Sequence, residues 1–187
     1  MNYDSRYRFS LPRELIALHP ADRRDESRLL GIDPAAGAVR ELGPFRSLAD
    51  HLVAGDLLVL NDTRVYKARL RGQRRTGGHV EALLLERGAR ARALVRPLTK
   101  LKTGEEILFP PYRARLAERH PDGSVTLDFG DATAGQAADD VGEMPIPPYL
   151  KRPVEPLDSE RYQTVYANRP GAVAAPTAGF HFTPALL

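Results

Sequence analysis

The sequence predicts an α/β (α+β) domain with a small antiparallel β-barrel inserted into it, and three observations support this fold class. Stretches with a helical or buried-strand pattern lie near both ends of the chain. Between them the hydrophobic period switches to two, in short strands without a helical pattern, which is typical of a small barrel. Glycine and proline pairs punctuate these strands. We therefore expect a discontinuous α/β domain at 1–64 and 151–187, which a barrel domain at 65–150 interrupts.

Composition narrows the class of protein. The 187 residues are 42% hydrophobic and 27% charged, as in a soluble globular protein with a core. No apolar run reaches the roughly 18 residues of a membrane span, and the N-terminus has no signal-like apolar region. The absence of cysteine excludes disulfides, thiolate metal sites and a cysteine nucleophile. We expect a cytoplasmic protein without a membrane partner, and the five scattered histidines predict no metal site.

The first 60 residues predict two short helices and two strands. A proline start and a His-Pro stop predict a helix over 12–18. A strand is expected over 29–32. One apolar face at i, i+3, i+4 and i+7 predicts a helix over 44–52. The run DLLVL predicts a buried strand over 56–60.

Four polar residues, Asn61, Asp62, Thr63 and Arg64, follow this strand directly. Polar side chains at the end of a buried strand are often part of a site, because the strand holds them rigidly. An Asx-type turn made by Asn61 and Asp62 explains the same residues equally well.

The predicted barrel carries most of the positive charge. Strands are expected at 80–86, 90–96, 105–109, 112–119 and 124–129, and alternation from residue 65 places Lys67, Arg69 and Arg71 on one face. From Arg64 to Lys102 there are twelve basic and two acidic residues, a net charge of +10, against 15 basic and 22 acidic residues, or −7, elsewhere. Such segregation favours a polyanion such as nucleic acid as partner; a solvated basic face without a partner remains the alternative.

Two later stretches are candidates for ligand contact. Five prolines between residues 145 and 156 force an extended path that either presents Tyr149 and Arg152 to a ligand or is a plain linker. The stretch 161–182, RYQTVYANRPGAVAAPTAGFHF, mixes hydroxyl, amide and imidazole groups with small residues that allow close approach to the main chain. It is typical of a pocket wall, with a buried small-residue turn as the alternative.

Taken in order, several motifs resemble one family. They are NDTRV at 61–65, ALVRP and KLK at 93–102, MPIPPYLKR at 144–152, RYQTVYA at 161–167 and AVAAPTAGFHFT at 172–183. With LPRELIALHP and RDESRLL near the start, these motifs are similar to the S-adenosylmethionine:tRNA ribosyltransferase-isomerases of queuosine biosynthesis. The resemblance runs through all 187 residues.

The resemblance implies an activity and its partners. Members transfer and isomerise the ribosyl group of S-adenosylmethionine onto 7-aminomethyl-7-deazaguanine at the tRNA wobble position, giving epoxyqueuosine-tRNA, adenine and methionine. S-adenosylmethionine is then a consumed substrate, no separate cofactor is expected, and the anticodon arm of tRNA is the macromolecular partner. We expect full-length members to be monomers. Family members continue well past the HFT motif, so we expect this chain to be the N-terminal part, completed by a C-terminal segment or a second chain; a catalytically incomplete tRNA-binding fragment is the alternative function.

Site residues follow from the motifs and from the chemistry the family implies. His181 is the candidate acid–base group, because removing the proton beside the sulfonium needs a base. The expected catalytic residues are His181, Tyr162 and Thr177. The expected substrate-binding residues are Asn61, Asp62, Thr63, Arg64, Tyr149, Gln163, Tyr166, Ala175, Pro176 and Gly179. The expected tRNA phosphate contacts are Lys67, Arg69, Arg96, Lys100, Lys102 and Arg152.

Overall fold

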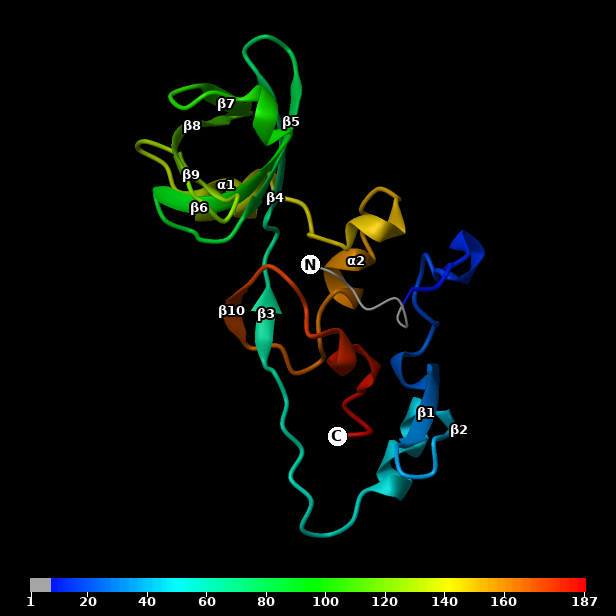
Figure 1. Ribbon diagram of the computed structural model, residues 1–187. Coiled ribbons are helices and arrows are strands. Elements are labelled where there is room, and N and C mark those ends of the chain that lie inside the picture. The colour runs from blue at the N-terminus through cyan, green and yellow to red at the C-terminus, as the bar shows by residue number, and fades with distance from the viewer. Residues whose placement is uncertain (1–7) are drawn as a thin grey trace.

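A computed structural model describes residues 8–187, so the first seven residues of the predicted 1–64 segment lie outside it. A closed antiparallel barrel stands at one end, and a loosely built half with short 3₁₀ turns and two small sheets stands at the other (Figure 1). Within residues 8–187 no helix is long and apolar enough to cross a bilayer, and no group of three or more His, Asp or Glu side chains is placed to hold a metal.

The barrel closes in the order β4-β5-β6-β9-β8-β7. In these strands small or branched apolar residues alternate with charged ones. The sequence suits a barrel because every second side chain of a strand points into its interior. Ala68, Leu70, Ile107, Leu116 and Leu127 are among the fully buried residues of this core. The strands are β4 (Arg69–Arg74), β5 (His79–Leu84), β6 (Arg90–Arg96), β7 (Glu106–Phe109), β8 (Tyr112–Arg119) and β9 (Val125–Asp128).

One helix packs on the barrel after the last strand. Helix α1 (Ala134–Val141) begins with a capping box. The Thr133 hydroxyl accepts a hydrogen bond from the Gln136 N–H, and the Gln136 Oε1 accepts one from the Thr133 N–H. Its buried alanines join the barrel core. The chain then leaves the barrel through the 3₁₀ turn η6 (Pro148–Leu150) and reaches the short α2 (Asp158–Arg161).

The other half holds two small sheets. Strands β1 (Arg28–Asp33) and β2 (Ala38–Pro44) form an antiparallel hairpin, which confirms the strand expected over 29–32. Strands β3 (Thr63–Val65) and β10 (Arg169–Ala172) pair in parallel. Because β3 precedes the barrel strands and β10 follows them, the barrel is an insertion between two strands that pair with each other.

Three expectations for this half are wrong in detail. The helix expected over 12–18 is the 3₁₀ turn η2 (Arg13–Leu15), and that expected over 44–52 is the 3₁₀ helix η4 (Phe45–His51). The buried strand expected over 56–60 is extended but exposed and unpaired. Short amphipathic helices owe most of their stability to tertiary packing, and neither η2 nor η4 has a buried residue. The remaining turns are η3 (Arg24–Glu26), η5 (Leu98–Lys100) and η7 (Thr177–His181).

Candidate functional site

The parallel pair β3–β10 joins the two predicted substrate motifs. Arg169 lies opposite Thr63, and Ala172 opposite Val65. The motif at 61–65 therefore lies beside the middle of the 161–182 stretch, although about a hundred residues separate them along the chain. Figure 1 shows β3 and β10 side by side below the barrel.

The polar residues before β3 hold this junction together. The Asn61 Oδ1 accepts a hydrogen bond from the Thr63 N–H at 2.9 Å, which is the Asx turn considered as an alternative. The Asp62 carbonyl accepts from the Asn168 N–H at 2.8 Å, and the Arg64 Nη2 donates to the Ala167 carbonyl at 3.0 Å. These contacts are internal, while the Arg64 side chain stays largely exposed.

Gln163 acts as a substitute strand partner. Its Oε1 accepts from the Val65 N–H at 3.0 Å and its Nε2 donates to the Val65 carbonyl at 2.5 Å. Both hydrogen-bonding ends of the amide are thus used to satisfy one β3 residue. The structure places Gln163 in support of β3 rather than in direct reach of a substrate, which differs from the sequence expectation.

His181 lies against an aromatic wall at the end of η7. Its ring centroid is 5.1 Å from that of Phe45, which also makes an edge contact with Phe182 at 5.0 Å. Burial lowers the pKa of the imidazole below the ordinary histidine value. The Arg24 guanidinium lowers this pKa further, while a hydrogen bond to the Arg24 main chain opposes the shift. The neutral imidazole, the form that accepts a proton, therefore predominates at neutral pH.

The two tyrosines pack on either side of η7. The Tyr162 ring meets Phe180 at 5.5 Å, and the Tyr166 ring meets Phe182 at 6.2 Å. Burial raises the pKa of both phenols, so their hydroxyls stay protonated. Gly179 lies so close to them that a Cβ there would overlap the Tyr166 hydroxyl and lie 2.7 Å from the Thr164 Cγ2. Glycine is required at 179 for this close approach.

The remaining small and polar candidates surround η7 or lie apart from it. Ala175 packs on the small cluster of Val65, Met144 and Ile146, Pro176 precedes η7, and Thr177 begins it with an exposed side chain. Tyr149 instead lines a groove of about 390 Å³ with the N-terminal segment. Five grooves of residues 8–187 lie elsewhere on the molecule, and residues 161–182 line none of them.

Sequence reasoning missed the arginines that assemble the wall. Arg24 donates to the Phe180 carbonyl at 3.2 Å and to the Glu160 carbonyl at 2.9 Å. Arg161 donates to the Ala21 carbonyl at 2.7 Å. Within the charged loop at 21–27, Arg23 pairs with Asp25, whereas Arg24 instead binds α2 and η7. The RDESRLL motif was the available signal for this role.

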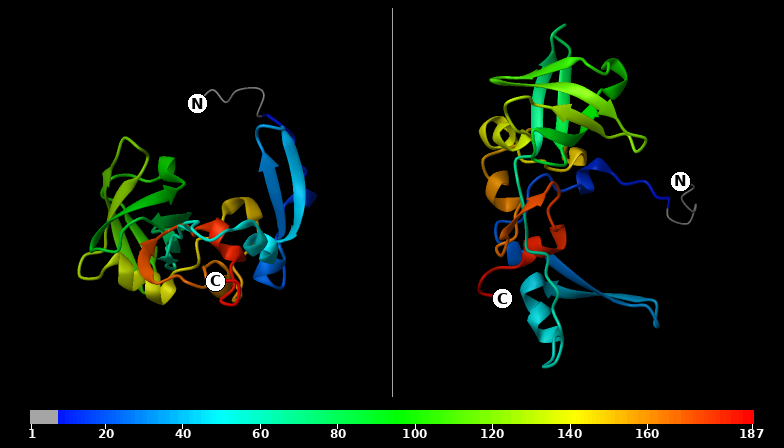
Figure 2. Two further views of the ribbon diagram at one scale, coloured as in Figure 1. Left: turned by 90° about the horizontal axis from the view of Figure 1, so that it is seen from below. Right: turned by 90° about the vertical axis from the view of Figure 1, so that its left-hand side faces the viewer.

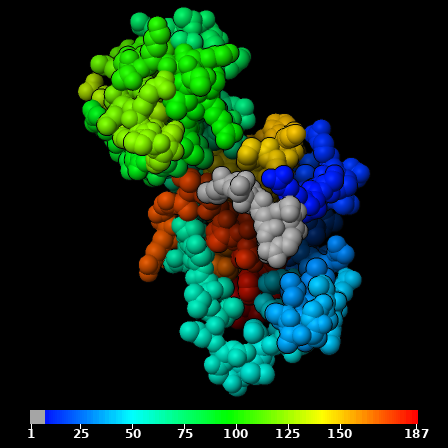
Figure 3. All heavy atoms as spheres, in the orientation of Figure 1, coloured from blue at the N-terminus to red at the C-terminus, as the bar shows by residue number. Residues whose placement is uncertain are grey.

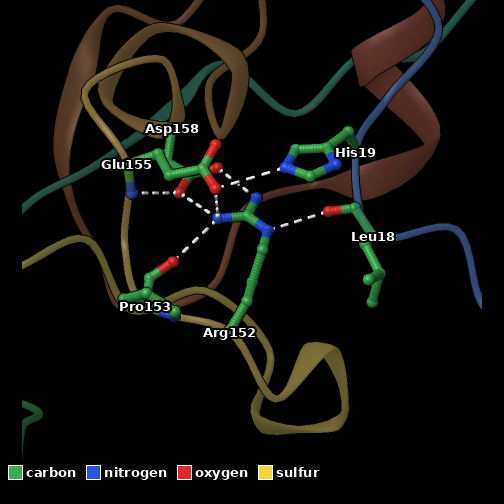
Figure 4. Close-up of polar contacts among 6 residues, drawn as sticks. All are labelled: Leu18, His19, Arg152, Pro153, Glu155 and Asp158. Carbon is green, nitrogen blue, oxygen red and sulfur yellow. Dashed lines mark hydrogen bonds and ion pairs between the residues drawn. The ribbon is translucent and has the colours of Figure 1, made fainter.

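Arg152 is also internal. Its guanidinium forms a two-pronged ion pair with Asp158, at 2.7 Å to each carboxylate oxygen, and donates to the Leu18 carbonyl at 2.9 Å (Figure 4). Only 10% of the Arg152 side chain and 9% of the Asp158 side chain is exposed. Glu155, which His19 contacts at 3.2 Å, completes the cluster. A nearby carboxylate therefore already neutralises the charge of Arg152, for which the sequence predicts a phosphate contact.

Most of the basic barrel charge is also neutralised. Seven of the twelve basic residues lie within 4.0 Å of a carboxylate, often one far away in sequence: Arg69, Arg71, Arg74, Arg75, Arg87, Arg90 and Arg92. Arg69 is buried as well, because the chain at 143–146 covers it and the Ile146 carbonyl accepts from its Nη2 at 2.9 Å. Arg69, the other predicted phosphate contact with a carboxylate partner, is thus also engaged within the protein.

Within residues 8–187, five of the twelve have no carboxylate partner: Arg64, Lys67, Arg96, Lys100 and Lys102. Arg96 lines a groove of about 400 Å³ with Arg71 and His79 on the outer wall of β4, β5 and β6. Lys100 and Lys102 follow it within six residues, all exposed. We call Lys67, Arg96, Lys100 and Lys102 the basic set; these four of the six expected phosphate contacts keep an available charge.

Fold and site together define a two-part protein, in which a closed β-barrel with a residual positive face is inserted beside a tyrosine- and histidine-bearing wall. Comparison with known proteins identifies the family. A sequence profile described as "Queuosine biosynthesis protein" matches residues 4–187. The chain belongs to the queuosine biosynthesis protein family.

The relatives share one name and a greater length. The S-adenosylmethionine:tRNA ribosyltransferase-isomerase of Citrifermentans bemidjiense is 46% identical over 188 residues, covering 98% of this chain and 55% of the relative. That of Pelobacter propionicus is 48% identical, covering 96% and 54%. The solved S-adenosylmethionine tRNA ribosyltransferase of Thermotoga maritima is 31% identical, covering 95% of this chain and 50% of that one, with a TM-score of 0.34. This chain spans about half the length of the curated relatives it matches.

Proposed function

We propose that this chain supplies the substrate wall and the tRNA-contacting barrel of an S-adenosylmethionine:tRNA ribosyltransferase-isomerase. The reaction transfers and isomerises the ribosyl group of S-adenosylmethionine onto 7-aminomethyl-7-deazaguanine at the tRNA wobble position, releasing adenine and methionine. S-adenosylmethionine is a consumed substrate, and no separate cofactor is invoked. Family membership supports the reaction class. The observation that carries the proposal is the meeting of the 61–65 and 161–182 motifs through β3 and β10, beside a neutral histidine.

His181 is the proposed base. The carbon beside a sulfonium is acidic, and loss of its proton leaves the electron pair on that carbon, from which rearrangement and departure of adenine follow. A half-buried imidazole with a lowered pKa is neutral at neutral pH, so one of its two ring nitrogens is unprotonated and able to take this proton. Tyr162, as a protonated donor, and Thr177, with an exposed hydroxyl, are the proposed groups for the departing adenine or the ribose.

Recognition of tRNA is assigned to the basic set on the barrel. Lysine and arginine without a carboxylate partner keep their full charge for phosphates, and each phosphate contact steepens the salt dependence of binding. Arg96→Glu is expected to weaken tRNA binding and to lower the slope of log Kd against log salt by about 1. Arg115→Glu is the matched control, because Arg115 is exposed, has no carboxylate partner within residues 8–187 and lies on β8, opposite β5 around the barrel. Equal losses of tRNA affinity from both substitutions would contradict the assignment of tRNA binding to the basic set.

The test of the reaction is adenine release from S-adenosylmethionine, with and without tRNA that carries the aminomethyl-deazaguanine. Release that depends on this tRNA and disappears in His181→Ala supports the proposal. Unchanged turnover in His181→Ala would remove His181 as the base.

A catalytically incomplete tRNA-binding chain is the second candidate function. The charges of the basic set, which have no carboxylate partner within residues 8–187, favour it. Salt-sensitive tRNA binding without adenine release identifies this case. The absence of both tRNA binding and adenine release would contradict both functions.

A further inference from the structure

Two grooves of the molecule adjoin at Arg71. The first, of about 400 Å³, lies on the outer wall of β4, β5 and β6 and is also lined by Arg96. The second, of about 410 Å³, is lined by Arg71 together with Lys151, on the connection that returns from the barrel. Figure 3 shows this connection, in yellow, at the waist between the green barrel and the rest of the molecule. The two grooves therefore form one track from the barrel wall to the connection.

A row of alternating charge lies along this track. Arg71 lies opposite Glu81 across β4 and β5, and Glu81 lies opposite Arg96 across β5 and β6. Directly opposed residues of antiparallel strands share one face of the sheet, so the three side chains stand side by side. Glu143, on the returning connection, contacts Arg71 from its other side. The order along the track is Glu143, Arg71, Glu81 and Arg96.

Arg71 is held by two carboxylates but is not enclosed by them. Its Nε donates to Glu143 at 2.8 Å, and its Nη1 lies 3.9 Å from Glu81. The Arg71 side chain is 56% exposed. A guanidinium has five N–H donors, and within residues 8–187 only this one N–H of Arg71 makes a hydrogen bond. Exposed ion pairs are weak, so a phosphate that reaches the free donors can replace either carboxylate.

Each end of the track carries an exposed cation without a carboxylate partner within residues 8–187. Arg96 is this cation on the barrel wall, and Lys151 is its counterpart on the connection. Lys151 has a left-handed backbone with a φ of 52°, a conformation that favours glycine. Backbone strain of this kind clusters at functional positions. Because the Lys151 side chain is exposed, the strain indicates a contact made outside this chain.

We propose that this track binds the phosphate backbone of tRNA, and that Glu81 and Glu143 occupy Arg71 in the free protein until a phosphate takes their place. The inference rests on the proposed function, because it takes tRNA as the partner. Strand spacing of about 4.8 Å puts Arg71 roughly 10 Å from Arg96, which is about three nucleotide steps along one strand of a duplex. The cations at the two ends attract the backbone, and displacement of the glutamates then adds a third contact at Arg71.

The track leads from the basic set toward the substrate wall. Val154, which lines the second groove, packs on the same small cluster as Tyr162 and Ala175 of the wall. In both views of Figure 2 the yellow and orange connection lies between the barrel and the other half. A polyanion that does not follow the whole track pays for displacing the glutamates without the contacts at both ends. Glu81 and Glu143 therefore act as specificity-determining residues, since they disfavour such partners.

The test is a double-mutant cycle on the affinity for tRNA that carries the aminomethyl-deazaguanine. Glu81→Gln combined with Glu143→Gln should raise this affinity at least about tenfold and steepen the slope of log Kd against log salt by about 1, because no carboxylate then competes for Arg71. In an Arg71→Gln background the same two substitutions should raise the affinity by no more than about threefold, which is the effect of net charge alone.

Glu106→Gln is the matched control. Glu106 pairs with Arg75 at 3.0 Å and with Arg113 at 3.7 Å on the barrel, and it lines neither groove of the track. Its loss changes the net charge as much as the loss of Glu81 or Glu143, so it should give no more than the net-charge effect. If the double substitution unfolds the chain, Glu143→Gln alone is carried through the same cycle.

Lys151→Gly separates a binding role from a structural one. Glycine relieves the left-handed backbone, so the thermal midpoint should rise. The affinity for tRNA should nevertheless fall, with a salt slope lower by about 1, because one phosphate contact is lost. A lysine with only a structural role would leave the affinity unchanged.

Four results would overturn the inference: no gain in affinity from the glutamate substitutions, an equal gain in the Arg71→Gln background, an equal gain from Glu106→Gln, or unchanged affinity in Lys151→Gly. Failure of Arg96→Glu to weaken tRNA binding would instead contradict the assignment of tRNA binding to the basic set. Failure of this inference is therefore distinguishable from failure of the proposed function.

Discussion

Removing the carboxylate of Asp158 should destabilise the protein more than removing any exposed ion-pair partner. Asp158 binds both Arg152 nitrogens at 2.7 Å and accepts from the Glu155 N–H at 2.8 Å, and neither side chain of the pair is more than 10% exposed. Asp158→Ala leaves a buried guanidinium without its counter-charge, which costs about 3–5 kcal/mol. That is a large fraction of the roughly 5–15 kcal/mol by which a domain is stable. The Leu18 carbonyl, held by the same guanidinium, should also be released.

Urea unfolding followed by circular dichroism measures this loss, with Asp139→Ala as the control. The Arg87–Asp139 pair is as short, at 2.6 Å, but exposed, and should contribute less than about 1 kcal/mol. Hydrogen bonding to Arg152 lowers the pKa of Asp158 below its usual value of about 3.9. Its stabilisation is therefore complete above that value and is lost as pH falls through the lowered pKa; Asp158→Asn should remove this dependence. Equal losses for Asp158→Ala and Asp139→Ala would refute the reasoning.

Three further experiments, a pH profile and two substitutions, test the site. Adenine release should keep its activity below the usual histidine pKa of about 6.5, because burial lowers the pKa of His181, and an acid limb at or above 6.5 in a pH–rate profile would contradict this. Gly179→Ala should cost about 1–3 kcal/mol in thermal unfolding through its overlap with the Tyr166 hydroxyl, and Tyr166→Phe should recover part of the loss; no recovery would place the clash elsewhere. Gln163→Leu leaves the Val65 N–H and carbonyl unpaired, so hydrogen exchange should accelerate at β3 but not at β6, and uniform acceleration would contradict a local role.

The barrel was predictable from sequence because the patterns that define its strands and turns are local. Strand β6 has the bounds expected, and β8 likewise, since period-two alternation and turn residues decide both ends. The strand at 56–60 shows the limit of such reasoning. The apolar run predicts a buried strand, but burial needs a partner, and within residues 8–187 the segment is exposed and has none.

The charge distribution and the candidate site were harder to predict for a different reason. The count of +10 between Arg64 and Lys102 ignores acids that strand pairing brings alongside, such as Glu143 beside Arg71 and Asp139 beside Arg87, 72 and 52 residues away. Likewise, composition placed Gln163 and His181 in one pocket wall. Sequence could not foresee that one amide would satisfy Val65 while Phe45, from a distant segment, would pack on the imidazole.

Because the barrel is inserted between two paired strands, contacts at its base determine how its positive face is held relative to the substrate wall. Tyr66 spans the junction: its N–H donates to the carbonyl of Ala172, the last residue of β10, at 3.4 Å, and its hydroxyl donates to the Leu84 carbonyl of the barrel at 2.8 Å. On the returning connection, Arg69 and Glu143 exchange two main-chain hydrogen bonds, at 3.2 and 2.8 Å. The first contact joins the barrel to β10, and the second joins the outgoing and returning connections to each other at the base of the barrel. The buried Arg69 guanidinium adds a third contact there, because it donates to the Ile146 carbonyl on the returning connection at 2.9 Å, so its burial supports the base of the barrel.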